Sequence, residues 1–133
     1  MPIRGIDHVA ITVSDIESAV AWYSRVLGAS PLYLAEWRAG KIPVVILQLG
    51  ESRLSLHAAA SPAKPHARTP TPGAVDLCFR WSGPLRDAEA QLAAGGVEIE
   101  EGPVPRPAAD GELGRSIYFR DGDGNLLELL STE

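Results

Sequence analysis

The sequence predicts an α+β fold made of two βαβββ modules that together form a half-open, barrel-like mixed sheet. Two observations carry this prediction. A strand, an amphipathic helix and three further strand-like segments occur in that order, and the same order then occurs again. We place the modules at about residues 4–57 and 74–131, joined by a proline-rich linker over residues 58–73. A chain of 133 residues suits one domain with a modest core.

The first module opens at residues 6–13, where apolar and polar residues alternate as in a half-buried strand. Ser14 and Glu17 form a capping-box pattern, so Ser14 is expected to cap the following helix. Apolar residues recur at helical spacing as far as Leu27, and Gly28 ends the helix. The three strand-like segments that follow are residues 31–37, 42–49 and 52–57.

The second module repeats this order from a strand at residues 75–81. Pro84 suits the first position of the next helix, and Gly95 with Gly96 ends it. The remaining strand-like segments are residues 97–100, 115–120 and 125–130. Residues 103–114 are predicted to be a long polar loop, with a lid and a disordered connector as the two alternatives.

The repeat places polar residues of ligand type at matching positions. When the first strands are superposed, His8 falls on Asp76, and when the last strands are superposed, His57 falls on Glu128. Random apolar strands rarely place four such residues in this way. We therefore take these four residues as the candidate site.

Two histidines and one carboxylate form a donor set for a divalent metal. His8, His57 and Glu128 would leave coordination positions open, which suits Fe(II), Mn(II), Ni(II), Co(II) or Zn(II). Glu128 lies between leucines, where a carboxylate either faces solvent or is compensated by a cation. For each histidine alone, a hydrogen-bonded structural role is the commoner alternative. It is the repeat that favours a metal site.

Composition narrows the class of partner. The net charge is −5 and no basic block occurs, which argues against nucleic acid and anionic membranes. The single cysteine, Cys78, excludes an internal disulfide and is expected in the core. His66, in the linker, is expected to be solvated. The short apolar run at the N-terminus fits neither a signal peptide nor a membrane span, so we expect a cytoplasmic protein.

Several motifs carry a resemblance to a known family. The sequence DHVAITVSD occupies residues 7–15, and YFRDGDGNLLE occupies residues 118–128. With the helix end at Trp22-Tyr23 to Leu27-Gly28, they resemble the vicinal oxygen chelate superfamily of glyoxalases, bleomycin-resistance proteins and extradiol dioxygenases. The resemblance covers nearly the whole chain. It is closest to glyoxalase-domain proteins, some described as virulence-associated, through PTPG at 70–73, DLCF at 76–79 and EGPV at 101–104.

The resemblance implies paired βαβββ units around one divalent metal ion, with His8, His57 and Glu128 as ligands and Glu128 also as the catalytic base. Asp76 stands where glyoxalase I has a histidine, so it is expected to be a partner of a ligand or a fourth ligand. Gly122 replaces the proline of the usual DPDGN turn. Asp121, Asp123 and Asn125 would allow calcium binding, but a turn between strands is the preferred interpretation.

The leading functional hypothesis is a metal-dependent glyoxalase-type enzyme, a lyase or isomerase, that acts on a small substrate with vicinal oxygens and uses a thiol cosubstrate. The alternatives are an extradiol ring-cleaving dioxygenase and a metal-free drug-sequestering protein like the bleomycin-resistance proteins. Tyr118 and Arg120 share one strand face and are candidates to line the cavity. A homodimer is expected, since sheet edges need cover and twofold assemblies are the commonest.

Overall fold

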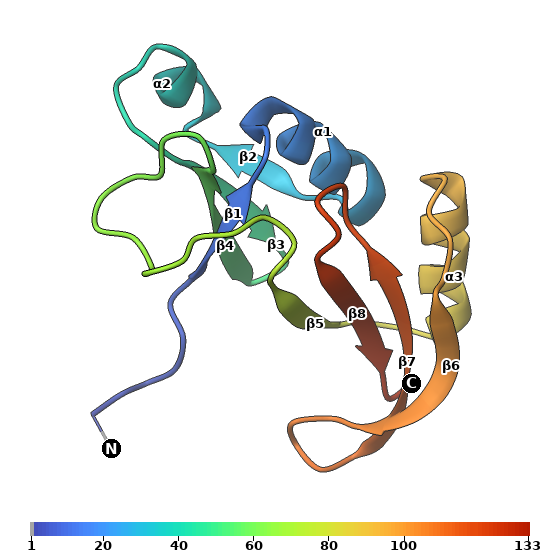
Figure 1. Cartoon of the computed structure of the whole chain (residues 1–133). Helices are drawn as coiled ribbons and strands as arrows, with labels where there is room; N and C mark the ends of the chain where they lie inside the picture. The colour runs from blue at the N-terminus through green and yellow to red at the C-terminus, as the bar shows by residue number, and fades with distance from the viewer. Residues whose placement is uncertain (1) are drawn as a thin grey trace. The chain divides into compact units, whose positions relative to one another are not determined.

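The computed structural model describes residues 2–133, and its internal contacts divide the chain into two units, Met1–Pro72 and Gly73–Glu133. Each unit has one four-stranded mixed sheet with a helix packed on it (Figure 1). The α+β class and the repeated strand–helix–three-strand order are confirmed. The strands, however, belong to two separate open sheets and not to one.

Unit 1 contains sheet 1, with the strand order β1-β4-β3-β2. Strand β1 runs parallel to β4, while β4 with β3 and β3 with β2 are antiparallel. The strand bounds are β1 Val9–Val13, β2 Ser30–Leu32, β3 Val45–Leu49 and β4 Ser52–Ala58.

Helix α1 (Ile16–Leu27) covers one face of sheet 1. Its N-cap is Asp15, whose side chain accepts a hydrogen bond from the Ser18 backbone N–H, so the assignment of Ser14 as the cap was wrong. The carboxylate one residue later satisfies an otherwise unpaired donor of the first turn. Gly28 ends the helix in the left-handed conformation at φ 69°, as predicted. The core between α1 and the sheet is made of Ile11, Val13, Ile16, Val20, Tyr23, Val26, Val45, Leu47, Leu54 and Leu56.

Helix α2 (Leu34–Arg38) replaces most of the strand expected at residues 31–37. Tyr33 adopts φ 63°, a left-handed conformation that turns the chain out of β2 after only three residues. Arg38 then forms two parallel hydrogen bonds with the Glu17 carboxylate, at 2.7 and 2.8 Å, which tie α2 to α1. This tertiary contact favours a helix where apolar periodicity alone favoured a strand.

Unit 2 contains sheet 2, with the strand order β5-β8-β7-β6. Strand β5 runs parallel to β8, and the other neighbours are antiparallel, which repeats the arrangement of unit 1. Helix α3 (Leu85–Ala94) packs on this sheet through Leu85, Ala88 and Leu92. The strand bounds are β5 Asp76–Arg80, β6 Glu101–Pro107, β7 Leu113–Arg120 and β8 Leu126–Ser131.

The predicted long loop at residues 103–114 is mostly a β-hairpin. Residues 97–100 are not a strand; β6 begins at Glu101, and only residues 108–112 connect it to β7. Three prolines hide the strand pattern of β6, but they are tolerated because β6 is an edge strand. The hairpin curls at its tip (Figure 1). There, Asp110 accepts a hydrogen bond from Arg80 of β5 at 3.4 Å.

Residues 121–125 form the turn between β7 and β8, as the sequence predicted. Asp121 Oδ1 accepts hydrogen bonds from the backbone N–H groups of Asp123 and Asn125, and its Oδ2 accepts one from Asn125 Nδ2. Both oxygens of this buried carboxylate are thus bonded to the chain itself, which leaves the calcium alternative without support.

Residues 59–75 form neither helix nor strand, in agreement with their proline content. Within residues 2–133, no helix has the length and apolar character needed to cross a membrane.

Candidate functional site

Each sheet has one face without a helix, which we call its open face. In sheet 1, the residues that alternate with the buried core residues are Ala10 and Thr12 on β1 and Ser55 and His57 on β4. In sheet 2 the corresponding residues are Cys78, Glu128 and Tyr118, on three neighbouring strands. Of the proposed ligand residues, His57, Asp76 and Glu128 lie on strands. All three are on the face of their sheet that is opposite the core.

His8 lies immediately before β1, so the expectation that it is a strand residue was wrong. Its side chain is 52% exposed, and its Nδ1 lies 2.8 Å from Asp7 Oδ1. Residues 2–8 make no strand pairing, so the alternating residues 6–8 lie outside the sheet. The carboxylate of Asp7 can hold the Nδ1 proton of His8, and this leaves Nε2 able to bind a metal.

His57 is half-buried near the end of β4, opposite Thr12. Burial lowers the pKa of His57, and the positive charges of His66 and His8 lower it further. His66 was expected to be solvated; it is indeed exposed, but it is close enough to His57 to affect its charge. The neutral imidazole is the form that binds metals.

The strand registers correct the equivalence drawn from the repeat. If His8 is superposed on Asp76, Ala10 falls on Cys78. Ala10 pairs with Ser55, and Cys78 pairs with Glu128. Ser55 is therefore the equivalent of Glu128, and His57 lies two residues further along the strand. A shift of two residues keeps the same face, so alternation alone could not reveal it.

His57 is opposite Thr12, four positions beyond His8 along the chain. The charge of His8 nevertheless acts on His57 and lowers its pKa. Within residues 2–133, no three His, Cys, Asp or Glu side chains are grouped as a metal ion requires. The structure thus places His57 and Glu128 on the open faces of their sheets, and His8 in the segment just before β1.

Glu128 lies at the centre of the open face of sheet 2, between Cys78 on β5 and Tyr118 on β7. Cys78 was expected in the core, but it is exposed, because β5 is an edge strand and this residue faces away from α3. Partial desolvation and the Glu128 carboxylate raise the pKa of the Cys78 thiol to about 12. At neutral pH the thiol is therefore protonated and weakly nucleophilic.

Asp76 is exposed at the start of β5, two residues before Cys78 and thus on the same face.

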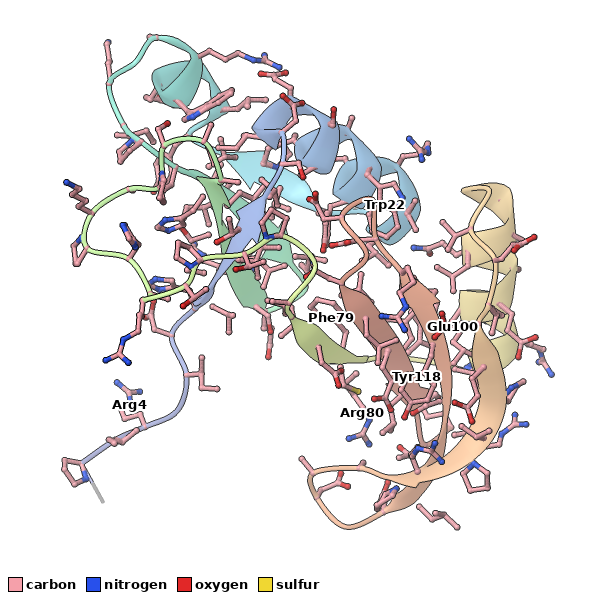
Figure 2. All side chains as sticks on the ribbon, in the orientation of Figure 1. Arg4, Trp22, Phe79, Arg80, Glu100 and Tyr118 are labelled. Atoms are coloured by element: carbon pink, nitrogen blue, oxygen red, sulfur yellow. The ribbon has the colours of Figure 1, made fainter. Side chains whose placement is uncertain are left out.

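Arg120, which was a candidate to line the cavity, is already bound to neighbouring residues. It forms two hydrogen bonds with the Glu100 carboxylate and a third with the Gly124 carbonyl. Tyr118 accepts a hydrogen bond from Arg106 Nε at 2.8 Å. Figure 2 labels Tyr118 and Arg80 among the side chains of sheet 2.

Sequence reasoning missed Arg106, because it placed this residue in a loop. The available signal was the alternation of Val104 and Arg106 with the prolines along what proved to be β6.

These features define a class: α+β proteins made of two βαβββ units, each with a helix on one face and polar side chains on the other. Residues 5–129 match the Glyoxalase/Bleomycin resistance protein/Dioxygenase superfamily, and the chain belongs to this superfamily. It is 41% identical over 129 residues to virulence protein STM3117 of Salmonella typhimurium, covering 97% of this chain and 85% of that protein. The crystal structure of STM3117 matches the whole of both chains with a TM-score of 0.88.

A second relative is the glyoxalase domain-containing protein RDO1 of Mycosarcoma maydis, 36% identical over 98% of this chain and 70% of that protein. The metallothiol transferase FosB of Shouchella clausii is 29% identical over 96% of this chain and 80% of that protein. The resemblance to glyoxalase-domain and virulence-associated proteins is thus confirmed.

Proposed function

We propose that this protein is a metal-dependent enzyme of glyoxalase type that acts on a small substrate with vicinal oxygens. His8, His57 and Glu128 would supply the ligands of one divalent ion. The observation that carries the proposal is that all three candidates lie outside the cores of their units, at or next to an open face. Membership of the superfamily, and the name of the metallothiol transferase among the relatives, support metal and thiol chemistry.

A bound divalent ion would act as a Lewis acid that stabilises negative charge developing on the two substrate oxygens. Glu128 would hold the ion and accept a proton from the substrate carbon. The Asp7 carboxylate, hydrogen-bonded to His8, would fix the orientation of the imidazole ring.

One observation favours a second candidate, a metal-free protein that binds a small molecule. Within residues 2–133, no three His, Cys, Asp or Glu side chains form a ligand group. A binding protein of this kind would need no such group. The extradiol dioxygenase alternative has no feature of its own in the described chain.

Metal binding separates these candidates. Protein purified without chelator is expected to hold about one Mn(II), Ni(II), Co(II), Zn(II) or Fe(II) per chain, measured by elemental analysis. His8→Ala, His57→Ala and Glu128→Gln should each lower the metal content strongly, since one of three ligands is lost. His66→Ala is the matched control. If the wild type and a His8→Ala, His57→Ala double variant hold equal metal, the metal proposal fails.

The metal content of His57→Ala is compared separately, because the strand register makes Ser55, and not His57, the equivalent of Glu128. If only His57→Ala keeps its metal while the other two variants lose it, His57 is not a ligand and the set must be completed by another residue. Methylglyoxal–thiol turnover and oxygen uptake with catechols then distinguish the glyoxalase type from the dioxygenase.

Asp76→Asn tests the position where this chain departs from glyoxalase I. We expect the metal to stay while activity falls by roughly 10–100-fold, as for a residue that orients a ligand. Loss of the metal as complete as in His8→Ala would make Asp76 a direct ligand.

A further inference from the structure

Arg106 is an arginine without a carboxylate partner on the open face of sheet 2. Its Nε donates to the Tyr118 hydroxyl oxygen, and its Nη1 donates to the Pro105 carbonyl at 2.8 Å. Nη2 has no acceptor within residues 2–133. By contrast, Arg38 and Arg120 each have a carboxylate within 3.0 Å. Arg106 therefore has no carboxylate in hydrogen-bond contact and keeps one donor edge available. The hydrogen bond to Tyr118 raises its pKa, and the charges of Glu101 and Glu128 raise it further from nearby.

Tyr118 holds this guanidinium in place. The guanidinium carbon lies 5.5 Å from the centre of the tyrosine ring, in addition to the hydrogen bond at the hydroxyl. Because the Tyr118 oxygen accepts from Arg106, its own O–H hydrogen must point to a different acceptor. In the described chain, neither Glu128 nor any other residue accepts it.

Ser116 adds a third donor on the same face. It lies two residues before Tyr118 on β7, is fully buried, and its hydroxyl has no hydrogen-bond partner. The strand register places Ser116 between the levels of Arg106 and Tyr118. A buried hydroxyl without a partner is unfavourable, and in a native protein it calls for an explanation. An acceptor supplied by a ligand would explain it.

We propose that Arg106, Tyr118 and Ser116 form a binding subsite for an oxyanion next to Glu128, which takes a carboxylate or phosphoryl group of the substrate. This inference names the substrate class of the proposed enzyme and to that extent rests on the proposed function. A guanidinium flanked by hydroxyl donors matches the planar or tetrahedral oxygens of such a group. A substrate bound there would extend towards Glu128, which is directly opposite Tyr118.

The position of Glu128 makes the subsite sensitive to charge. An unneutralised Glu128 carboxylate repels an anion on the neighbouring strand, whereas a divalent ion bound to Glu128 would remove the repulsion. Glu128→Gln should therefore strengthen anion binding in metal-free protein. If Glu128 or its metal were instead the receptor, the same substitution would weaken the binding.

The experiment measures the affinity of the 133-residue chain for inorganic phosphate and for acetate, with chelator and with Mn(II), by calorimetry. The chemical shift of Arg106 Nε–H reports where the anion binds. Arg106→Gln should lower the affinity for the preferred anion by about tenfold, as expected for one charge-assisted hydrogen bond. Arg106→Lys and Tyr118→Phe should lower it less, since each keeps the cation.

Arg115→Gln is the matched control, because it removes one positive charge from the same hairpin on the other side of β7. It should leave the affinity unchanged. Equal affinity in wild type and Arg106→Gln, or an equal loss in Arg115→Gln, would overturn the subsite. Preference for phosphate or for acetate identifies a phosphoryl or a carboxylate substrate. Phosphate or acetate binding that depends on Arg106, in a protein that binds none of Mn(II), Ni(II), Co(II), Zn(II) and Fe(II), would refute the proposed metal function and leave the subsite standing.

Discussion

Asn125 shows how a single buried polar residue holds the end of sheet 2. It is 1% exposed; its Oδ1 accepts a hydrogen bond from the Val75 N–H, and its Nδ2 donates to Asp121. The motif at residues 121–125 was recognised from the sequence as a turn. Its further contact with Val75, 50 positions away, was beyond sequence reasoning because it depends on the pairing of β5 with β8.

Asn125→Ala should lower the free energy of unfolding by about 2–3 kcal/mol, because it deprives the Val75 N–H of its acceptor and the Asp121 carboxylate of a donor. Chemical denaturation monitored by circular dichroism measures the change. Glu98→Ala, at an exposed residue of the same unit, should change stability by less than about 0.5 kcal/mol. A similarly small effect of Asn125→Ala would show that water replaces these bonds.

In the β6–β7 hairpin, the close approach of the two strands requires a glycine in β6. Gly102 lies at the irregular pairing between Glu101 and Val104, with φ 111°. A side chain at this position would meet the Ser116 carbonyl and would come within 3.0 Å of Ile117 Cα. The sequence shows only a glycine before a proline there; the close approach of β7 makes the glycine necessary.

Gly102→Ala should destabilise the protein by roughly 2–4 kcal/mol, through backbone strain together with overlap against β7. Gly122→Ala is the matched control, since a Cβ at Gly122 would meet nothing within 4 Å and its φ is not in the left-handed region. Thermal unfolding of both variants gives the comparison. Equal midpoints would mean that β6 moves away from β7 at little cost.

The hairpin also carries Arg106 and Tyr118, so its assignment as strand changes the functional interpretation. While residues 103–114 were expected to be a loop, Arg106 had no defined neighbour. Antiparallel pairing with β7 brings it to the tyrosine.

For the whole molecule, the exposed side chains and the charge distribution favour self-association. Ile3 and Ile6 are 72% and 84% exposed in the segment before β1. The acidic residues are concentrated in Gly73–Glu133, while Met1–Pro72 has a small excess of basic residues. Complementary units of two chains would attract each other.

We expect a homodimer by sedimentation, weakened by Ile3→Asp and Ile6→Asp together and by high salt. Leu113→Asp, at a side chain 73% exposed in the other unit, is the control and should not change the association. A monomer at every protein concentration would reject the dimer.

The sequence by itself determined the repeated βαβββ order, the end of α1 at Gly28, the turn at residues 121–125 and the family, because each rests on local patterns of apolarity, glycine and turn residues. Only the tertiary structure decided the helix after Tyr33, the strand β6, and the position of His57 along β4 relative to β1. These depend on pairing partners distant in sequence. Alternation with a period of two shows which face a residue occupies, but the position along the strand is set by the register with its neighbours.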